Sequence, residues 1–281
     1  MISLITTTLD GDFIQLKKLF DSLNRQSNID FEVVFVNQTT SSIDCLEYDF
    51  HIKEIASEKI SLSKARNIAM SKINGDIVGF PDDDCFYSVD AIDMISQAFN
   101  KHSNISFLFA NHINPATKIS ETCKSFKDNE CINVYNIKLS NSITIFVKKN
   151  DFIDIKYDEN MGVGAMYGSS EEADYILQAI KQNKTGVFIE KIEIYHQAFG
   201  DYPSITTNKA YQYSLGLAHF WFKNRQVLGN INFVINLFIK PVLGLVIAII
   251  QISHDKIRVR YAKLSAIIVY TYQRYNLENI D

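Results

Sequence analysis

The stretch of sequence that decides the fold is Gly75-Asp76-Ile77-Val78-Gly79-Phe80-Pro81-Asp82-Asp83-Asp84. It places a short apolar run, typical of a buried strand, directly before three consecutive carboxylates, which repel one another unless solvent or a cation compensates their charge. Asp82 and Asp84 are two residues apart, so in an extended segment both side chains project to the same side and can share one hard divalent cation. A solvated turn is the simpler interpretation because Asp is favoured in turns, but a helix cap uses one Asp and leaves two unexplained.

On both sides of this stretch, apolar runs rich in β-branched residues alternate with amphipathic segments. This alternation predicts an α/β protein with βαβ units around a mostly parallel sheet. In open α/β sheets ligands collect outside the carboxyl ends of the strands, so the strand-to-loop junctions are the candidate site. We expect strands over 2–8, 31–36, 76–80, 105–110, 143–147 and 187–195, helices over 13–23, 63–72, 90–101 and 170–182, and a loop-rich region over 111–141.

Length and composition exclude several classes of protein. The chain of 281 residues is 47% hydrophobic and 21% charged, unlike disordered chains, collagen-like repeats or small disulfide scaffolds. Lys and Arg total 28 against 32 Asp and Glu, and the resulting charge of −4 predicts no nucleic-acid partner. Four cysteines without CxxC spacing fit a reducing, cytoplasmic compartment. No basic N-terminal region precedes a long apolar run, so no secretory signal is expected.

A second motif, Ser61-Leu62-Ser63-Lys64-Ala65-Arg66-Asn67-Ile68-Ala69, precedes the acidic stretch. In this order and at this spacing, the two motifs resemble the Leu-Ser-x-Ala-Arg-Asn segment and the DxD motif of family 2 glycosyltransferases of the GT-A fold. The resemblance covers roughly residues 1–200. It implies a GT-A-like, Rossmann-type mixed sheet with flanking helices. It also implies an inverting, metal-dependent transfer of a sugar from a nucleotide-sugar donor to a glycan or lipid-linked acceptor, in bacterial surface polysaccharide synthesis.

The resemblance also implies roles for individual residues. Asp82 would contact the ribose or sugar of the donor, and Asp84 would bind the Mn²⁺ or Mg²⁺ ion that bridges its diphosphate. His196, which follows the strand expected over 187–195, matches a later His that joins the motif on the metal, although an isolated His is more often structural. The donor-binding residues expected are Thr6, Thr8, Asp10, Asn37, Lys64, Arg66, Asp82 and Asp83.

Some of these donor-binding assignments have simpler alternatives. The threonines are also ordinary strand formers, and Lys64 can be an exposed helical residue. Asn37 stands where the family usually carries an Asp that reads uracil. Asn can still hydrogen-bond a base edge but offers no carboxylate. The resemblance to the family implies a UDP-sugar as the donor, and GDP- and dTDP-sugars are the alternatives.

The run from Met161 to Asp174 contains the candidate general base. Three glycines lie within seven residues, and a helix is expected immediately afterwards. The family motif Gly-Glu-Asp-x-Asp/Glu places Glu172 where the base usually stands, and a retained carboxylate can deprotonate an acceptor hydroxyl. The alternative is a capping box from Ser169 to Glu172, in which case Glu171 is the better base.

The last part of the chain has a different character, which predicts a division into a catalytic domain over 1–205 and a helical region over 206–281. Residues 231–252 are almost wholly apolar apart from Lys240-Pro241 and two asparagines, and a basic cluster follows at Lys256, Arg258, Arg260 and Lys263. A charged residue inside a membrane span costs roughly 2.5–3.5 kcal/mol, and Pro241 should break the helix. We therefore expect two shorter interfacial helices, peripheral on the inner face of the cell membrane. A buried helical pair, a homo-oligomer interface and a true span are the alternatives.

Two other functions are compatible with an acidic α/β site. A nucleotidyltransferase would carry a Gly-rich, basic loop after the first strand, but Leu9-Asp10-Gly11-Asp12 has no basic residue. The other candidate is a non-catalytic scaffold at the membrane, which would bind a nucleotide but show no turnover.

Overall fold

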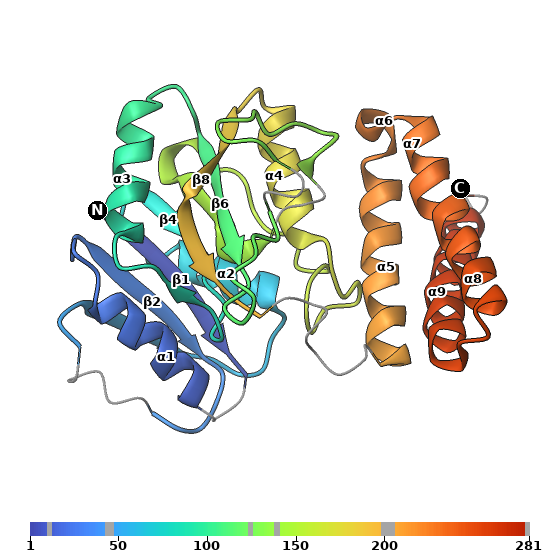
Figure 1. Ribbon diagram of the computed structural model, residues 1–281, viewed down its shortest axis with the longest axis horizontal. Helices are drawn as coiled ribbons and strands as arrows, with labels where there is room; N and C mark the ends of the chain where they lie inside the picture. The colour runs from blue at the N-terminus through green and yellow to red at the C-terminus, as the bar shows by residue number, and fades with distance from the viewer. Residues whose placement is uncertain (10–12, 43–47, 123–125, 138–140, 198–205, 279–281) are drawn as a thin grey trace.

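The computed structural model describes residues 1–9, 13–42, 48–122, 126–137, 141–197 and 206–278. Within these residues, eight strands form one mixed sheet in the order β3-β2-β1-β4-β7-β6-β8-β5, as Figure 1 shows. The strands are β1 (Ile2–Thr8), β2 (Phe31–Asn37), β3 (His51–Ala56), β4 (Ile77–Gly79), β5 (Phe86–Tyr87), β6 (Phe107–Ile113), β7 (Ile145–Lys148) and β8 (Gly186–Tyr195). The helices are α1 (Phe13–Asn24), α2 (Leu62–Met70), α3 (Ala91–Lys101), α4 (Glu171–Lys181), α5 (Thr207–Lys223), α6 (Arg225–Leu228), α7 (Asn230–Val234), α8 (Lys240–Ile250) and α9 (His254–Glu278).

Alternation along the central strands builds a hydrophobic core on each face of the sheet. Leu4 and Phe35 point to the face covered by α1 and α3, whereas Ile5 and Val36 point to the face covered by α2 and α4. The sequence of a strand that is buried on both sides is a continuous apolar run. This pattern is the reason that β1 and β2 could be predicted from the sequence.

A buried carboxylate fixes the amino-terminal edge of the sheet. Glu32, at the start of β2, accepts hydrogen bonds from Ser3 Oγ (2.6 Å), Asn74 N (2.6 Å) and Asn74 Nδ2 (2.8 Å). Burial opposes ionisation of Glu32, but these hydrogen bonds outweigh it and lower its pKa. The network holds the turn before β4 in place, and with it the acidic stretch at the other end of that strand.

The predicted fold class, a GT-A-like mixed sheet with flanking helices, is confirmed, but the sheet is larger than expected. β7 runs antiparallel to both β4 and β6, and β5 runs antiparallel to β8. β3 and β5 were not predicted. β3 is an edge strand with several exposed residues, so its sequence lacks the continuous apolar run of a central strand.

The C-terminal helices form a group beside α4 (Figure 1). α5 lies against α4, and α9 packs between α5 and α8. Ala218 and Phe220 of α5, Leu237 and Ile267 belong to the same apolar cluster as Tyr175 of α4. The helical group therefore shares a core with one face of the sheet.

The apolar run forms one continuous helix, so the expectation that Pro241 separates two shorter helices is wrong. Residues Ile235–Ile239 make a π-helical turn between α7 and α8, and Pro241 lies in the first turn of α8. A proline lacks an N–H and crowds the carbonyl four residues earlier, and a wider turn accommodates both effects.

By length and composition, the helix Asn230–Ile250 is the one described helix that could cross a membrane. Core helices of soluble proteins satisfy the same criterion when they are mostly buried, but this one leaves most of its surface exposed. Its exposed aliphatic side chains are Ile231, Val234, Ile239, Val242, Leu243, Val246, Ile247, Ile249 and Ile250.

Candidate active site

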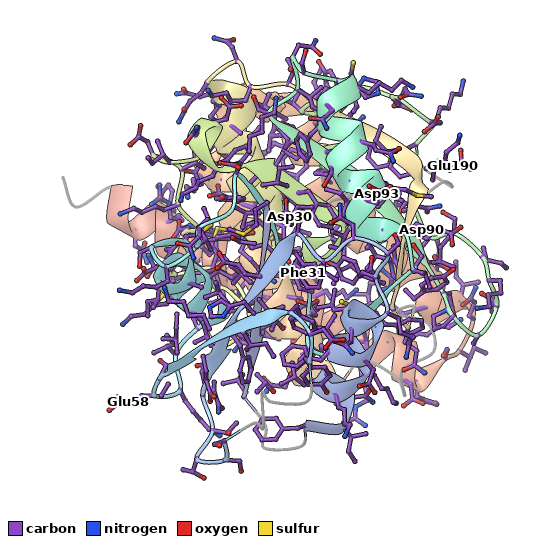
Figure 2. All side chains as sticks on the ribbon, turned by 90° about the vertical axis from the view of Figure 1, so that its left-hand side faces the viewer. Asp30, Phe31, Glu58, Asp90, Asp93 and Glu190 are labelled. Carbon is purple, nitrogen blue, oxygen red and sulfur yellow. The ribbon has the colours of Figure 1, made fainter. Side chains whose placement is uncertain are left out.

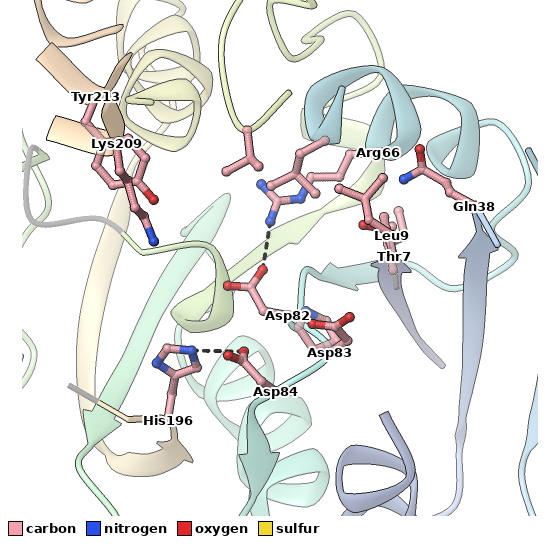
Figure 3. Close-up of a pocket in the computed structure, with 14 residues that line it drawn as sticks. Thr7, Leu9, Gln38, Arg66, Asp82, Asp83, Asp84, His196, Lys209 and Tyr213 are labelled. Atoms are coloured by element: carbon pink, nitrogen blue, oxygen red, sulfur yellow. Dashed lines mark hydrogen bonds and ion pairs between the residues drawn. The ribbon is translucent and has the colours of Figure 1, made fainter. Parts of the chain in front are cut away.

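A cavity of about 350 Å³ opens at the carboxyl ends of β1 and β4, where ligands of open α/β sheets collect (Figure 3). One wall comes from the end of β1, and the facing wall comes from Lys209 and Tyr213 of α5. Its floor is the acidic turn Asp82-Asp83-Asp84, and Arg66 of α2 lies beside this turn.

Three residues of the cavity offer a set of metal ligands. One ligand atom each from Asp82, Asp84 and His196 lies within 4.8 Å of the other two. His196 Nε2 is 2.9 Å from Asp84 Oδ1. Burial disfavours the charged imidazole, but the hydrogen bond and charge of Asp84 outweigh it and raise the pKa of His196. Two carboxylates and an imidazole form a donor set that suits a divalent cation such as Mn²⁺ or Mg²⁺.

Asp83 has a different environment from its two neighbours. Burial raises its pKa to about 6, although a hydrogen bond with the Thr8 side chain opposes the shift. The side chain faces the end of β1 rather than His196 (Figure 3). Asp83 thus joins the acidic turn to β1.

Arg66 is the buried positive charge of the site. Its side chain is 2% exposed, and its guanidinium lies over the rings of Phe80 and Tyr157, at 5.9 Å and 5.3 Å from the ring centroids. Arg66 Nη2 is 3.2 Å from Asp82 Oδ1, and Nη1 is 3.8 Å from the carboxylate of Glu172. One guanidinium therefore pairs with carboxylates from two segments that are far apart in the sequence.

Other residues of the same motif hold the opposite loop against α2. Ser61 caps the helix by accepting from Lys64 N, and Ser63 Oγ donates to Met161 O (2.7 Å). Asn67 donates to Tyr157 O (2.9 Å) and accepts from Tyr157 N (3.0 Å). The motif thus fixes both the acidic turn, through Arg66, and the segment that leads to α4, through Ser63 and Asn67.

Glu171 and Glu172 begin α4 in unlike surroundings. Glu171 is 3% exposed, and its carboxyl group packs against Gly162, where an added Cβ would lie 2.9 Å from Glu171 Cδ. Burial and the neighbouring charge of Glu172 raise the pKa of Glu171, which favours its neutral form. Glu172 is partly exposed and faces Arg66. The two carboxyl groups can therefore carry different charges at neutral pH.

The capping box considered for this helix is wrong. The N-cap is Ser170, in a left-handed conformation (φ 70°) and without a side-chain capping bond. Ser169 Oγ instead donates to Tyr213 O of α5 (2.8 Å). The carboxylate of Glu172 is thus available to the site.

Asp174, one turn into α4, links the site to the C-terminal helices. It is fully buried and accepts from Lys223 Nζ (2.9 Å), Asn224 Nδ2 (3.0 Å) and Gln178 Nε2 (3.0 Å). These bonds anchor the end of α5 to the helix that carries Glu171 and Glu172.

Four of the expected donor-binding residues, Thr6, Thr8, Asn37 and Lys64, do not line the cavity, and Asp10 lies outside the described residues. Thr8 is buried, and its side chain hydrogen-bonds Asp83. Thr6 is buried on the α1 side of β1 because it has the same strand parity as Leu4. The amide of Asn37 already donates to Ser41 O and Glu54 Oε1, and it accepts twice from Thr39. Lys64 is exposed on α2.

The cavity wall contains residues that the sequence analysis missed: Thr7, Leu9, Gln38, Lys209 and Tyr213. Once Ile5 is assigned to the face covered by α2, the alternation of side chains along β1 predicts that Thr7 and Leu9 point to the same face, and therefore toward the cavity. Gln38 Oε1 accepts from Ile60 N (2.7 Å), which positions the side chain at the cavity next to the end of β2. No local signal in the sequence identified Lys209 and Tyr213, because only the packing of α5 brings them to the site.

The model of the family described as Glycosyl transferase family 2 matches residues 4–167, so the chain belongs to glycosyl transferase family 2. An uncharacterized glycosyltransferase of Haemophilus influenzae is 24% identical over 193 residues, 65% of this chain and 63% of that protein. The matched region thus spans less than two thirds of the relative's length.

Solved structures share the fold. Mannosyltransferase PcManGT from Pyrobaculum calidifontis, in complex with GDP-Man and Mn²⁺, has a TM-score of 0.67 at 10% identity, over 97% of this chain and 87% of its own. S. aureus TarS 1-349 in complex with UDP-GlcNAc has a TM-score of 0.59 at 14% identity, over 97% and 92%. Against another crystal structure of S. aureus TarS, the match covers 96% of this chain and 54% of that chain. These structures establish the GT-A fold.

Replacing Arg66 with methionine should destabilise the metal-free protein. The change leaves buried carboxylates without a counter-charge, which typically costs about 3–5 kcal/mol. Burial raises the pKa values of Asp82 and Glu171. On acidification, these two groups therefore become protonated at a higher pH in the folded state than in the unfolded state. The loss should therefore be largest near pH 8 and shrink as the pH falls toward 5.

Urea denaturation in EDTA measures this difference. Lys64→Met, an exposed change on the same helix, should cost less than about 0.5 kcal/mol. Equal losses in the two variants, or a loss for Arg66→Met that grows on acidification, would contradict the charge assignment.

Proposed function

We propose that the chain is an inverting, metal-dependent glycosyltransferase of the hexosyltransferase type, which moves a sugar from a nucleotide-sugar to a glycan or lipid-linked acceptor. One observation carries the proposal: Arg66, which lines the cavity, pairs with Asp82 of the metal-ligand turn and with the carboxylate of Glu172, which lies beside the cavity lining. This arrangement puts a cation site for a leaving diphosphate beside a base for an attacking hydroxyl.

The proposed reaction is a single displacement at the anomeric carbon. Glu172 takes the proton from an acceptor hydroxyl as its oxygen forms a bond to that carbon. The bond from the anomeric carbon to the diphosphate oxygen breaks on the opposite side, with inversion. A divalent cation held by Asp82, Asp84 and His196 supplies Lewis-acid stabilisation of the leaving diphosphate. Lys209, on the facing wall, adds positive charge.

A UDP-sugar is the proposed donor, with GDP- and dTDP-sugars as alternatives. TarS has been solved with UDP-GlcNAc and PcManGT with GDP-Man, so both nucleotide classes occur among proteins of similar fold. Thr7, Gln38 and Asp83 line the cavity where a nucleoside would enter from β1 and β2. Because the amide of Asn37 is already fully bonded, Gln38 is the more available group for a base edge.

We place this activity on the inner face of the cell membrane, in the synthesis of a bacterial surface polysaccharide. The exposed aliphatic side chains of the helix Asn230–Ile250 support this placement, since soluble monomers rarely expose a contiguous apolar face of this kind. In this proposal, residues 206–281 attach the catalytic region 1–205 to the bilayer surface. A second copy of the chain is the competing occupant of the same face.

The alternatives to a glycosyltransferase have less support. In the part of β1 and its end that the structure describes, the wall is formed by Ile5, Thr7 and Leu9 and offers no basic group to bind the triphosphate of a nucleotidyl donor. A non-catalytic scaffold does not require a carboxylate base near the metal ligands, whereas Glu172 pairs with the same guanidinium as Asp82.

The metal assignment predicts the effect of one substitution. With Mn²⁺, the purified protein should release a nucleoside diphosphate from one nucleotide-sugar, and Asp84→Ala should reduce the rate by at least about 100-fold, because the cation loses a ligand next to His196. A coupled assay for UDP or GDP measures the release.

Asp90→Ala is the matched control for this substitution. Asp90 is an exposed carboxylate without a side-chain capping bond, and it lies on the face turned away from the C-terminal helices, with Asp30, Asp93 and Glu190 (Figure 2). It should keep the full rate. Traces for wild type and Asp84→Ala that coincide would contradict the metal site.

The two glutamates at the start of α4 should respond differently to amide substitution. Glu172→Gln removes the proposed base and should lower kcat by about 10²–10⁴-fold. Glu171→Gln replaces a buried carboxyl group that favours its neutral form, so activity near pH 7 should change by less than about tenfold. Steady-state rates with both substrates test this. A larger loss in Glu171→Gln than in Glu172→Gln would exchange the two roles.

The membrane placement predicts binding to vesicles of phosphatidylcholine and phosphatidylglycerol. The double change Leu243→Glu and Ile247→Glu, at side chains 54% and 53% exposed, should reduce co-flotation by at least about tenfold. Ile153→Glu, at a side chain 66% exposed but outside the C-terminal helices, should have no effect. Wild-type protein that stays unbound, or that forms a stable dimer by light scattering without lipid, would contradict the proposal.

A further inference from the structure

A second cavity, of about 330 Å³, lies on the other side of Tyr213. Its walls come from α5, the start of α8, α9 and the pair Ser169-Ser170. None of the catalytic or donor-binding roles assigned above uses this cavity.

Three cations surround the second cavity without a counter-charge. They are Lys240 of α8 and Arg260 and Lys263 of α9. In the described part of the chain, no carboxylate lies within the 4.0 Å of an ion pair from any of them. Burial and the positive charge of Arg260 lower the pKa of Lys263, and no acidic group offsets the shift. Three neighbouring cations without a carboxylate favour an anionic ligand.

The second cavity adjoins the proposed reaction centre. Tyr213 lines both cavities. Burial, followed by the charges of Glu171, Glu172 and Asp82, raises the pKa of Tyr213. Ser169 and Ser170, on the wall, directly precede the two glutamates. A ligand held here is thus close to the proposed base.

The second cavity also has apolar side chains and reaches the exposed helix. Leu217 and Ile267 line it with Pro241, which belongs to the helix whose aliphatic side chains are exposed. A lining of hydroxyl groups, cations and apolar side chains, next to an exposed aliphatic surface, matches a phosphate ester on a hydrocarbon chain better than a free inorganic anion.

We propose that this second cavity binds the phosphate group of a lipid-linked acceptor and thereby orients the acceptor sugar past Tyr213 toward Glu172. The proposal rests on the function proposed above and specifies its acceptor as a phosphate ester of a long aliphatic or isoprenoid alcohol. Arg260 and Lys263 hold the phosphate, and the hydrocarbon chain runs along the exposed face of α8.

The test measures binding of geranyl phosphate, a short soluble probe, to the full chain in EDTA. Arg260→Gln with Lys263→Gln should weaken binding by at least about tenfold, since two charge-assisted contacts are lost. The matched control is Lys256→Gln with Arg258→Gln, which removes the same charge from exposed positions of the same helix that do not line the cavity. The control should bind within about twofold of wild type.

Two further probes separate the sources of affinity. Geraniol, which lacks the phosphate, and inorganic phosphate, which lacks the chain, should each bind at least about tenfold more weakly than geranyl phosphate. Equal binding of geraniol would overturn the anion site, and equal binding of inorganic phosphate would overturn the lipid-linked acceptor. If the two double variants lost the same affinity for geranyl phosphate, the effect would come from general surface charge, and the proposal would be overturned.

Parallel measurements keep the outcomes distinguishable. Circular dichroism checks that each variant is folded, and Lys240→Gln, an exposed single change at the same cavity, replaces the double variant if that one unfolds. UDP and GDP binding with Mn²⁺ reports the first cavity and should be unchanged in all variants. Nucleotide binding with no cavity-specific loss of geranyl phosphate overturns this inference alone. A cavity-specific loss in a protein that binds no nucleotide overturns the proposed function and leaves only an anion site.

Discussion

The ion pairs of the buried guanidinium of Arg66 are the constraint on which the rest of the site depends. Carboxylates from the turn after β4 and from the start of α4 lie 3.2 Å from its Nη2 and 3.8 Å from its Nη1. Burying like charges together is costly unless a cation compensates them, so this geometry requires α2, the acidic turn and α4 to be brought together. Ser63 and Asn67 of the same helix secure the loop that completes the arrangement.

The same constraint makes the C-terminal helices part of the site. Asp174 of α4 is fully buried and is matched by Lys223 and Asn224 at the end of α5. α5 in turn carries Lys209 and Tyr213 into the cavity wall. If α5 moved away from α4, the buried carboxylate of Asp174 would lose its bonds from Lys223 and Asn224 and keep the one from Gln178, and one side of the cavity would open. The position of the helical region is therefore coupled to the shape of the site through a buried charge.

Sequence patterns predicted the parts of this protein that are local. The central strands, the acidic turn and Arg66 followed from apolar runs and spaced motifs, and the grouping of Asp82 and Asp84 with His196 followed from the resemblance to the family. The misses have physical reasons. Thr6 was chosen over Thr7 because a run of three threonines does not show which parity faces the cavity. Asn37 is occupied by Ser41, Glu54 and Thr39, a network that only the folded chain reveals. The predicted break at Pro241 ignored the π-helical turn that accommodates a proline without ending the helix.

The distribution of charge bears on how two anionic ligands could occupy neighbouring cavities. In the donor cavity positive charge is scarce: Arg66 is already paired with Asp82, so a diphosphate there depends on an added cation and on Lys209. Among the described residues, the cations of the second cavity form no ion pair with a carboxylate, so an anion can bind there without a metal. Tyr213 lines both cavities, and its pKa is raised, which favours the neutral phenol. In the two proposals, this neutral side chain separates a metal-dependent anion site from a metal-independent one, so chelation should empty the first and leave the second intact.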